Sequence, residues 1–381
     1  MTRRTPAAPI LLLTTLAALV ALSGCGVRDR LDPQAATGSA PAAFDTAVAA
    51  ATMLGGTSIE PGVAATGDSA EHALDTVDGV RTYHLYVPAS QRPTDAVAAT
   101  DAVAATGDAA PVAGAAAPAP LLLALHGGGG TGTQFEQQSR FDELAEANGF
   151  LVAYPDGTGI GRFERGRVWN AGRCCGPAAD GSDDPDDVAF LAAVIDDIAS
   201  GHAVDRDRVV ITGHSNGSMM ALRFACERAD LVAGVASQAG PLVTDGACEP
   251  SRPVPVLALH GTADANVPYG GGTGPRTGEL RYEPATVHIA AIAAAQGCTG
   301  EPVDRVVDGA PAVSVRHWDG CGGGAGVDVG LVSVEGAAHP WMGAEGGRGL
   351  TGPFADDPYP DFDSSAAVWS FLAAQRRGDG R

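Results

Sequence analysis

The stretch that decides the fold is Arg208-Val209-Val210-Ile211-Thr212-Gly213-His214-Ser215-Asn216-Gly217-Ser218-Met219-Met220. A β-branched run leads into Gly-x-Ser-x-Gly, and a helix-forming run from Met219 to Glu227 follows. Between a strand and a helix this pattern presents a serine on a sharp turn, whose glycines leave room for neighbouring backbone. The alternative is an ordinary glycine-rich turn, because Gly, Ala and Ser are abundant here. The stretch predicts that Ser215 is a nucleophile.

The rest of the chain predicts the sheet around this turn. From residue 120 apolar runs alternate with amphipathic segments, which is typical of a mostly parallel sheet covered by helices. We expect strands at 81–88, 121–125, 150–154, 232–237, 254–259, 313–316 and 330–334, and helices at 135–148, 187–200, 285–296 and 365–377. The sequence thus predicts one α/β domain over residues 76–378. Residues 90–118, where Asp95–Thr100 repeats as Asp101–Thr106, are expected to be a low-complexity surface insertion.

The N-terminal segment has the features of an export signal. Two arginines precede an apolar core, Ile10–Leu22, and Leu22-Ser23-Gly24-Cys25 resembles a bacterial lipobox. Residues 1–24 are therefore predicted to be a lipoprotein signal peptide, with Cys25 as the lipidated residue. Secretion after ordinary cleavage and an uncleaved membrane anchor are the alternatives. Residues 25–75 are rich in Ala, Gly and Pro, which predicts a flexible tether.

Composition excludes several classes of function. All 24 basic residues are arginine, so a lysine Schiff base and a lysine-bearing phosphate loop are absent. A net charge of −21 argues against nucleic acid as a partner and favours a soluble monomer. The glycine-rich run at 270–274 lacks dinucleotide-binding spacing, and the acidic run at 182–187 lacks the spacing of a calcium loop. We expect no cofactor, no metal, and contact with a membrane only through the lipid on Cys25.

The cysteines indicate an oxidising compartment. Six remain besides Cys25, and an even number in an exported chain predicts three disulfides. The six are Cys174, Cys175, Cys226, Cys248, Cys298 and Cys321. Cys298 with Cys321 is the most local pairing. The adjacent Cys174 and Cys175 are expected to reach Cys226 and Cys248, in either order, instead of bonding to each other.

A nucleophilic serine needs a base, and in sheets of this type the order is Ser, acid, His. His260, His288, His317 and His339 follow Ser215 in the chain. His288 falls in an expected helix and His317 in or at the end of a strand, where a structural role is commoner. His339 lies in a loop just past the last strand, at the carboxyl edge of the sheet. We therefore predict His339 as the base.

The acid is predicted by the same reasoning. Asp264 lies in the loop that directly follows the apolar run 254–259, so it can orient His339 and stabilise the imidazolium. The alternative for Asp264 is a turn former that caps its own loop. The rival acids, none of which follows a buried strand so directly, are Asp245, Asp304, Asp308, Asp319 and Asp328.

Donors for an oxyanion and walls for a pocket are the remaining candidates. The Asn216 N–H, directly after the nucleophile, and the N–H of Gly128 in the run that follows residue 125 are the expected donors. His126 is expected to orient this loop. The aromatic side chains predicted to contact substrate, each of which could equally be core, are Trp169, Tyr269 and Trp341.

Over residues 80–377 the chain resembles the secreted polyhydroxybutyrate-depolymerase and feruloyl-esterase family of α/β-hydrolases, including its lipoprotein esterases. The resemblance rests on separated motifs. They are Tyr83–Pro88, Leu125–Gly129, Tyr154–Gly157, Trp169-Asn170 with Cys174–Gly176, Asp186–Val188 with Phe190, Gly213–Gly217, His260–Thr262 with Asp264 and Val267–Tyr269, and Trp369 with Phe371. The resemblance implies Ser215, Asp264 and His339 as the triad.

The resemblance also implies a function. It is a serine esterase acting on feruloyl or acetyl esters of polysaccharide, or on 3-hydroxybutyrate oligomers. The loop Gly336–Gly343 departs from the family pattern, because Pro340 follows the histidine and Met342 replaces a proline. The competing hypothesis is a cell-surface binding lipoprotein with an inactive hydrolase site.

Overall fold

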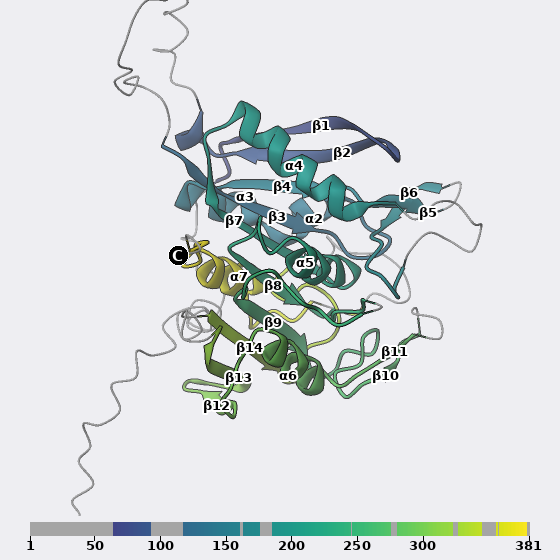
Figure 1. Cartoon of the computed structure of the whole chain (residues 1–381), viewed down its shortest axis with the longest axis vertical. Helices are drawn as coiled ribbons and strands as arrows, with labels where there is room; N and C mark the ends of the chain where they lie inside the picture. Colours follow the sequence, from purple (N-terminus) through teal and green to yellow (C-terminus); the bar gives the residue numbers. More distant parts are fainter. Residues whose placement is uncertain are drawn as a thin grey trace, which may run out of the picture. The chain divides into compact units, whose positions relative to one another are not determined.

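The computed structural model describes residues 64–92, 117–160, 163–175, 185–244, 246–275, 280–322, 327–344, 356 and 358–378. They form one large sheet with helices on both faces (Figure 1). The strands of this sheet are β1 (Asp68–Thr76), β2 (Gly79–Val87), β3 (Ala119–Leu125), β4 (Leu151–Pro155), β7 (Val204–His214), β8 (Gly234–Gln238), β9 (Val256–Gly261), β12 (Val303–Val307), β13 (Ala310–Cys321) and β14 (Val327–Val334). The helices are η1 (Ala89–Gln91), α2 (Gly132–Ser139), α3 (Phe141–Asn148), α4 (Asp187–Gly201), α5 (Asn216–Glu227), α6 (Ala285–Ala295) and α7 (Ser364–Leu372).

Strand β3 shows why the sheet is covered on both sides. Its side chains alternate, so that Leu121, Leu123 and Leu125 join one apolar cluster whereas Leu122 and Ala124 join the other. All five are fully buried. A strand that is apolar at every position has to lie between two layers of helix, which is the pattern of a buried parallel sheet.

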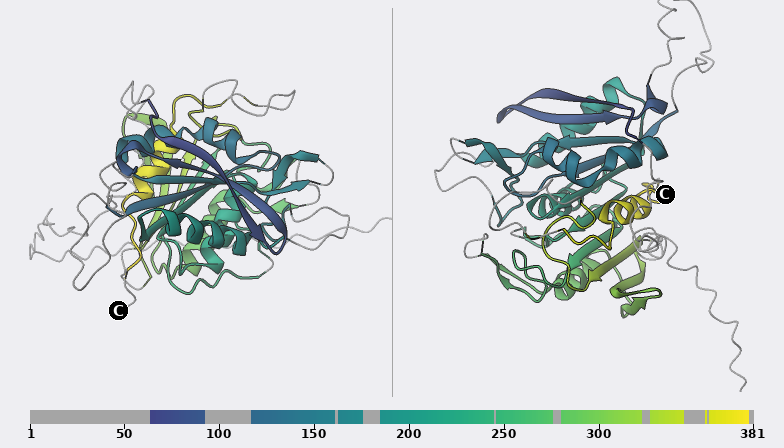
Figure 2. Two further views of the ribbon diagram at one scale, coloured as in Figure 1. Left: turned by 90° about the horizontal axis from the view of Figure 1, so that it is seen from above. Right: turned by 180° about the vertical axis from the view of Figure 1, so that it is seen from behind.

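The two clusters assign the helices to the two faces. Side chains of α4, α5 and α6 pack into the cluster that contains Leu121, and those of α2, α3 and α7 pack into the cluster that contains Leu122. The three views show this layering and the twist of the sheet (Figures 1 and 2).

The order of strands identifies the fold. The sheet runs β1-β2-β4-β3-β7-β8-β9-β14-β13-β12. Neighbours from β4 to β14 are parallel, and the pairs at the two ends are antiparallel. Two small hairpins, β5 (Thr158–Ile160) with β6 (Phe163–Val168) and β10 (Gly272–Thr273) with β11 (Arg281–Tyr282), lie outside this sheet. The predicted α/β-hydrolase fold with a mostly parallel central sheet is confirmed.

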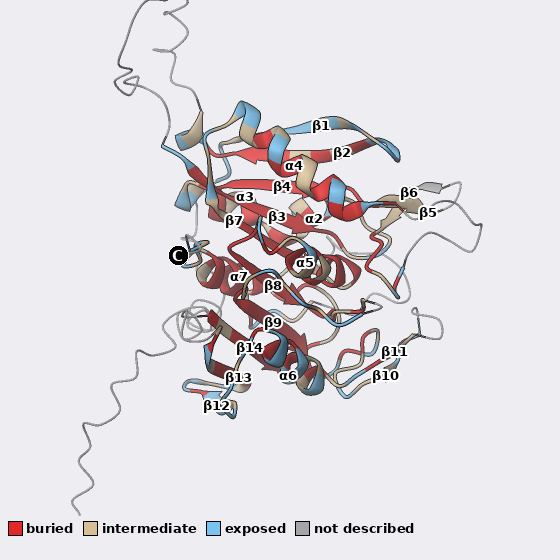
Figure 3. Cartoon of the chain, viewed as in Figure 1, coloured by how far each residue is buried: buried red, intermediate tan, exposed pale blue. Residues whose placement is uncertain are grey.

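Burial falls from the centre of the sheet to its edges. Figure 3 shows the central strands buried and β1 and β12 largely exposed. The sequence prediction was wrong at one of these edges. Residues 68–75 were assigned to the tether, but β1 pairs along its whole length with β2. Its side chains are mostly exposed, so β1 lacks the apolar alternation by which a strand is recognised.

A second correction concerns the predicted helix 135–148. It consists of two helices, because Arg140 adopts a left-handed backbone conformation (φ 56°) that ends α2 before α3 begins. The signal peptide, Cys25, nearly all of the tether and most of the insertion 90–118 lie outside the described residues. Among the described helices, none is long and apolar enough to cross a membrane.

Candidate active site

Ser215 stands on the turn between β7 and α5, as the sequence predicted. Its backbone is left-handed (φ 54°), and its N–H donates to the carbonyl of Gln238 on the neighbouring strand. The turn is closed by glycines, because a Cβ on Gly213 would lie 2.3 Å from the Gly217 carbonyl oxygen, and one on Gly217 would lie 2.3 Å from the His126 carbonyl oxygen. The strained conformation therefore depends on small residues on both sides of the serine.

Three loops at the carboxyl edge of the sheet bring Ser215, His339 and Asp264 together. The Ser215 hydroxyl lies 2.9 Å from Nε2 of His339. Nδ1 of His339 lies 2.8 Å from Oδ2 of Asp264. These loops follow β7, β14 and β9, and β9 pairs in parallel with β14, so the two loops that carry the acid and the histidine start side by side.

The environment of Asp264 keeps its carboxylate ionised. Burial works to raise its pKa, but hydrogen bonds from His260 and His339 outweigh burial and hold the pKa well below its ordinary value. The other oxygen, Oδ1, accepts the backbone N–H groups of Asn266 and Val267 at 2.8 and 2.9 Å. Asp264 therefore caps its own loop and binds His339 at the same time.

The loop that carries His339 is fastened by side chains. Nε2 of His214 lies 2.8 Å from the His339 carbonyl oxygen, and the Gln238 amide donates to the Pro340 carbonyl at 2.9 Å. The Trp341 indole N–H donates to the Ser365 hydroxyl at 2.9 Å. Each contact comes from a different element, namely β7, β8 and α7.

The loop after β3 lies against the serine turn. The N–H of Gly129 donates to the Arg167 carbonyl and that of Gly130 to the Gly127 carbonyl. Both amides are thereby occupied, which leaves those of Gly127 and Gly128 as the candidates for binding an oxyanion. A Cβ on Gly128 would lie 3.5 Å from Cβ of Asn216, so this glycine faces the residue that carries the second predicted donor.

His126 orients this loop, in keeping with its predicted role. Its Nε2 accepts the Gly157 N–H at 2.9 Å, so the ring proton is on Nδ1, which lies 2.8 Å from the Gly127 carbonyl oxygen. Burial lowers the pKa of His126 to about 4. The ring is neutral near pH 7 and is fully engaged with backbone.

Asn216 and Trp169 are joined by a pair of hydrogen bonds. The Asn216 side-chain oxygen accepts the Trp169 N–H at 2.7 Å, and its side-chain nitrogen donates to the Trp169 carbonyl at 3.0 Å. The indole N–H of Trp169 donates to the His126 carbonyl at 2.9 Å. This tryptophan therefore ties the loop after β3 to the serine turn.

The predicted aromatic walls need correction. Trp169 has no exposed surface and Trp341 is 2% exposed, so neither presents a face to a substrate in this structure. Trp341 instead packs edge-on against Phe135 and Phe141. Trp169 and Trp341 can be buried because the indole N–H of each donates to a buried acceptor. Tyr269 is partly buried, and its hydroxyl lies 2.8 Å from that of Ser333.

The disulfide prediction was partly wrong. The pair Cys298–Cys321 is present, but Cys174 bonds to the adjacent Cys175, and Cys226 bonds to Cys248. The adjacent pair is possible because Cys175 adopts a left-handed backbone conformation (φ 62°), which the sequence did not reveal. Cys226 meets Cys248 because the chain after β8 returns along α5, where their Cα atoms are 5.6 Å apart.

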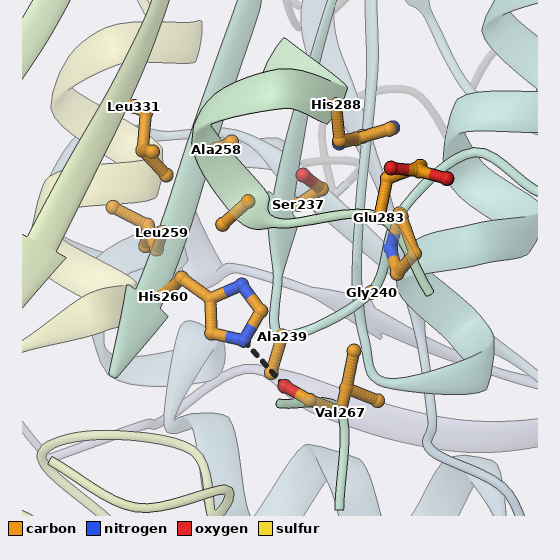
Figure 4. Close-up of a pocket in the computed structure, with 12 residues that line it drawn as sticks. Ser237, Ala239, Gly240, Ala258, Leu259, His260, Val267, Glu283, His288 and Leu331 are labelled. Atoms are coloured by element: carbon orange, nitrogen blue, oxygen red, sulfur yellow. Dashed lines mark hydrogen bonds between the residues drawn. The ribbon is translucent and has the colours of Figure 1, made fainter. Parts of the chain in front are cut away.

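A small hollow lies between the ends of β8 and β9 and helix α6 (Figure 4). It reaches the active site through His260, one of its lining residues, which contacts Asp264. Its walls are mostly apolar, and the polar side chains that line it are Ser237, His260, Glu283 and His288. Nε2 of His260 lies 2.8 Å from the Val267 carbonyl oxygen and 3.3 Å from Oδ2 of Asp264. In Figure 4 its other ring nitrogen points into the hollow. Burial and the neighbouring His260 lower the pKa of His288 to about 4.

Sequence reasoning missed two side chains of this site, His214 and His260. His214 occupies a variable position of the Gly-x-Ser-x-Gly pattern, so no signal marked it. His260 stands four residues before Asp264, and that spacing was available as a signal. In the described ranges no three His, Cys, Asp or Glu side chains are grouped so that they could hold a metal ion.

Comparisons with known proteins indicate similarity to esterases. Residues 108–251 match the family model described as esterase PHB depolymerase. The chain is 34% identical over 227 residues to feruloyl esterase B of Piromyces equi and 35% identical over 236 residues to the putative esterase NocK of Nocardia uniformis subsp. tsuyamanensis. These alignments include 58% and 59% of this chain and span 39% and 66% of the relatives' own length.

Among solved structures, an acetyl xylan esterase from Aspergillus awamori superposes with a TM-score of 0.46 at 14% identity, over 71% of this chain and 94% of that one. The family model extends from the low-complexity insertion through the serine turn, and the alignments with the two relatives each include more than half of the chain. The chain is thus similar to the esterases of the family that includes the polyhydroxybutyrate depolymerases and the feruloyl esterases.

Proposed function

We propose that this chain is a serine esterase that hydrolyses carboxylic esters outside the cytoplasm through an acyl-enzyme. The observation that carries the proposal is the chain of two hydrogen bonds from Ser215 through His339 to Asp264, at 2.9 and 2.8 Å. A hydroxyl, an imidazole and an ionised carboxylate in this order are what acyl transfer to serine requires. Similarity to the two named relatives adds support, because both are esterases.

The geometry translates into two steps. In the first, the Ser215 oxygen attacks the ester carbonyl carbon while its proton passes to Nε2 of His339. The bond to the alcohol oxygen then breaks, and His339 returns the proton to the departing alcohol. In the second step water attacks the acyl-enzyme, His339 takes one proton from that water, and Ser215 regains a proton as the acid leaves.

The remaining groups stabilise charge. Asp264 stays ionised and balances the imidazolium that forms twice in each cycle. The backbone N–H groups of Gly128 and Asn216 are the proposed donors to the carbonyl oxygen as it becomes negative. Because the amides of Gly129 and Gly130 are already bonded, Gly128 is favoured over them.

The substrate is proposed to be a feruloyl or acetyl ester of polysaccharide, or a 3-hydroxybutyrate oligomer. Support comes from the relatives, which include a feruloyl esterase and a bifunctional acetylxylan esterase and xylanase from Neocallimastix patriciarum. Rates on methyl ferulate, p-nitrophenyl acetate, p-nitrophenyl butyrate and a hydroxybutyrate oligomer would rank the three classes. Equal, slow rates on all four would argue against each of them.

Export and lipid attachment at Cys25 complete the proposal. The charged start, the apolar core and the lipobox support it, as do the three disulfides, which persist outside the cytoplasm. Replacing Cys25 with Ala should release the protein from membranes if the lipid is its anchor. Unchanged retention would contradict the lipoprotein assignment.

Titration with a fluorophosphonate tests the catalytic proposal. Wild-type protein should be labelled once, at Ser215, and Ser215→Ala should lose labelling and lower kcat on the order of 10⁵-fold. Ser218→Ala is the matched control, because this serine lies one turn along the same helix and bonds to the Gly240 carbonyl instead. Folded wild-type protein that resists labelling would favour the binding lipoprotein with an inactive site.

A further inference from the structure

His214 touches both halves of the proposed catalytic machinery. Its Nε2 lies 2.8 Å from the carbonyl oxygen of His339, and the two imidazole rings are 5.0 Å apart. On its other side, Nδ1 faces the loop after β3, where a Cβ added to Gly127 would lie 3.0 Å away. One side chain therefore lies between the loop that carries the base and the loop that carries a proposed oxyanion donor.

The chemistry of this contact fixes the form of the ring. A carbonyl oxygen only accepts, so the ring proton is on Nε2 and His214 is the donor. Burial, together with the neighbouring His339, lowers the pKa of His214 to about 3, so the ring is neutral near pH 7. A neutral imidazole whose proton is already given to a carbonyl is not suited to act as a second base.

The hydrogen bond from His214 acts directly on the residue that carries the proposed base. Other side chains anchor this loop at Gly336, Pro340 and Trp341, and Asp264 binds the His339 ring, whereas His214 binds the backbone of His339 itself. Without the imidazole, the His339 carbonyl would lose its donor and the ring would lose a neighbour. Reacting groups tolerate little displacement, and a shift of about 1 Å can cost roughly 10²-fold in rate.

We propose that His214 is a positioning residue that holds His339 in hydrogen-bonding distance of Ser215 and sets the spacing between the base loop and the loop after β3. The proposal rests on the serine esterase function proposed above. It predicts an effect on kcat rather than on KM, because His214 acts through His339 and not on the substrate.

Two substitutions separate the hydrogen bond from simple packing. His214→Leu fills most of the space without a donor, and His214→Gln keeps an N–H at a similar reach. His288→Leu and His288→Gln are the matched controls, because His288 is another shielded histidine, on α6, whose Nε2 accepts the Leu242 N–H and does not contact His339. Steady-state kinetics on p-nitrophenyl acetate and thermal unfolding are measured for all four variants.

We expect His214→Leu to lower kcat about 10- to 100-fold with KM within about twofold of the wild type. His214→Gln should recover kcat to within about threefold of the wild type, and the two His288 variants should keep it. The proposal is overturned if His214→Leu keeps full kcat, if folded His214→Gln is as impaired as His214→Leu, or if His288→Leu loses the same activity.

A second readout does not depend on turnover. Nitrogen-15 NMR of the histidine rings reports the proton shared between Nδ1 of His339 and Asp264. That proton should be protected from exchange in wild type and His214→Gln and should exchange faster in His214→Leu. Equal protection in all three would overturn the positioning role. Altered protection in a protein whose Ser215 resists fluorophosphonate would instead sink the esterase function and leave the role of His214 intact.

Discussion

The two sides of the active site are held in different ways. The nucleophile side (residues 126–130, 169–175 and 213–217) is fixed largely through backbone groups, by the close approach of Gly217 to the His126 carbonyl and by the two bonds between Asn216 and the Trp169 backbone. The acid–base side (residues 260–267 and 336–342) has one such backbone approach, in which a Cβ on Gly261 would lie 2.2 Å from the Ala337 carbonyl oxygen. Its histidine loop is otherwise fixed by side chains, chiefly those of Asp264, His214 and Gln238.

This difference explains why the nucleophile side is easier to recognise in a sequence than the acid–base side. A backbone that approaches another backbone requires glycine, so the nucleophile side leaves a local pattern that can be read directly. A loop held by distant side chains leaves no pattern, since its partners are dispersed along the chain. It also separates the expected effects of substitution. Apart from Ser215 itself, side-chain changes on the nucleophile side should act on stability and alignment, and those on the acid–base side should act on the chemistry.

Apart from the loss of Ser215 itself, the largest effect is expected on the acid–base side, from Asp264→Asn. An amide cannot balance the imidazolium and favours the wrong tautomer of His339, so kcat should fall about 10³- to 10⁴-fold. Kinetics on p-nitrophenyl acetate, with thermal unfolding as a check of the fold, measure this. Asp304→Asn is the control, because that carboxylate pairs with Arg316 on the surface. A loss of less than tenfold would show that Asp264 only caps its loop.

The disulfide that fastens α5, the helix that follows the nucleophile side, should matter for stability. Cys226 and Cys248 are 22 residues apart, and closing a loop of this length in the unfolded chain stabilises the fold by about 3 kcal/mol. The double substitution Cys226→Ser with Cys248→Ser should lose about that much in urea unfolding. The double substitution at Cys174 and Cys175, which closes almost no loop, is the control and should lose far less. Equal losses would rule out the loop-closure explanation.

A smaller effect is expected from Asn216→Ala. The variant keeps its backbone N–H but loses both bonds to Trp169, so the second proposed oxyanion donor is less well aligned. We expect kcat to fall about tenfold, within the range for one or two lost hydrogen bonds. Asn148→Ala, which removes a side-chain bond to the Leu144 carbonyl in α3, is the matched control. Unchanged kcat would show that the backbone of this side needs no such clamp.

An effect that vanishes near pH 7 and grows only in acid concerns His288 beside the hollow. The pKa of His288 is lowered from its ordinary value near 6.5 to about 4. Between these two pH values the histidine therefore binds a proton in the unfolded chain but not in the folded protein. Stability should therefore fall as pH falls from 6.5 to 4, by up to about 1.4 kcal/mol per pH unit more in wild type than in His288→Gln. Urea unfolding at pH 7.5, 6 and 5 checks this. Parallel stability curves would contradict it.

Much of the site could be predicted from sequence. The Gly-x-Ser-x-Gly turn located Ser215, and the rule that acid and base follow at the carboxyl edge selected Asp264 and His339, whose side chains the structure brings together. The central strands could be predicted too, because an apolar run such as residues 121–125 has few other uses.

The rest could not be predicted because it depends on partners or on backbone conformation. The contact between His214 and the His339 carbonyl spans 125 residues, and nothing local marks it. The left-handed conformation of Arg140 divides a predicted helix, and that of Cys175 accompanies a disulfide between adjacent cysteines. Neither conformation can be predicted from the residue type. Trp169 and Trp341 looked like exposed walls because an aromatic in a loop carries no sign of its burial.

The pattern of the cysteines has a consequence for how this domain assembles. Among the described residues the disulfides join cysteines 1, 22 and 23 positions apart, so each bond can close within a short emerging segment of chain. The pairing of β3 with β7, by contrast, joins residues some 90 positions apart. Oxidation therefore can be complete before the sheet exists, and the order of its ten strands has to be specified by apolar packing and strand pairing alone.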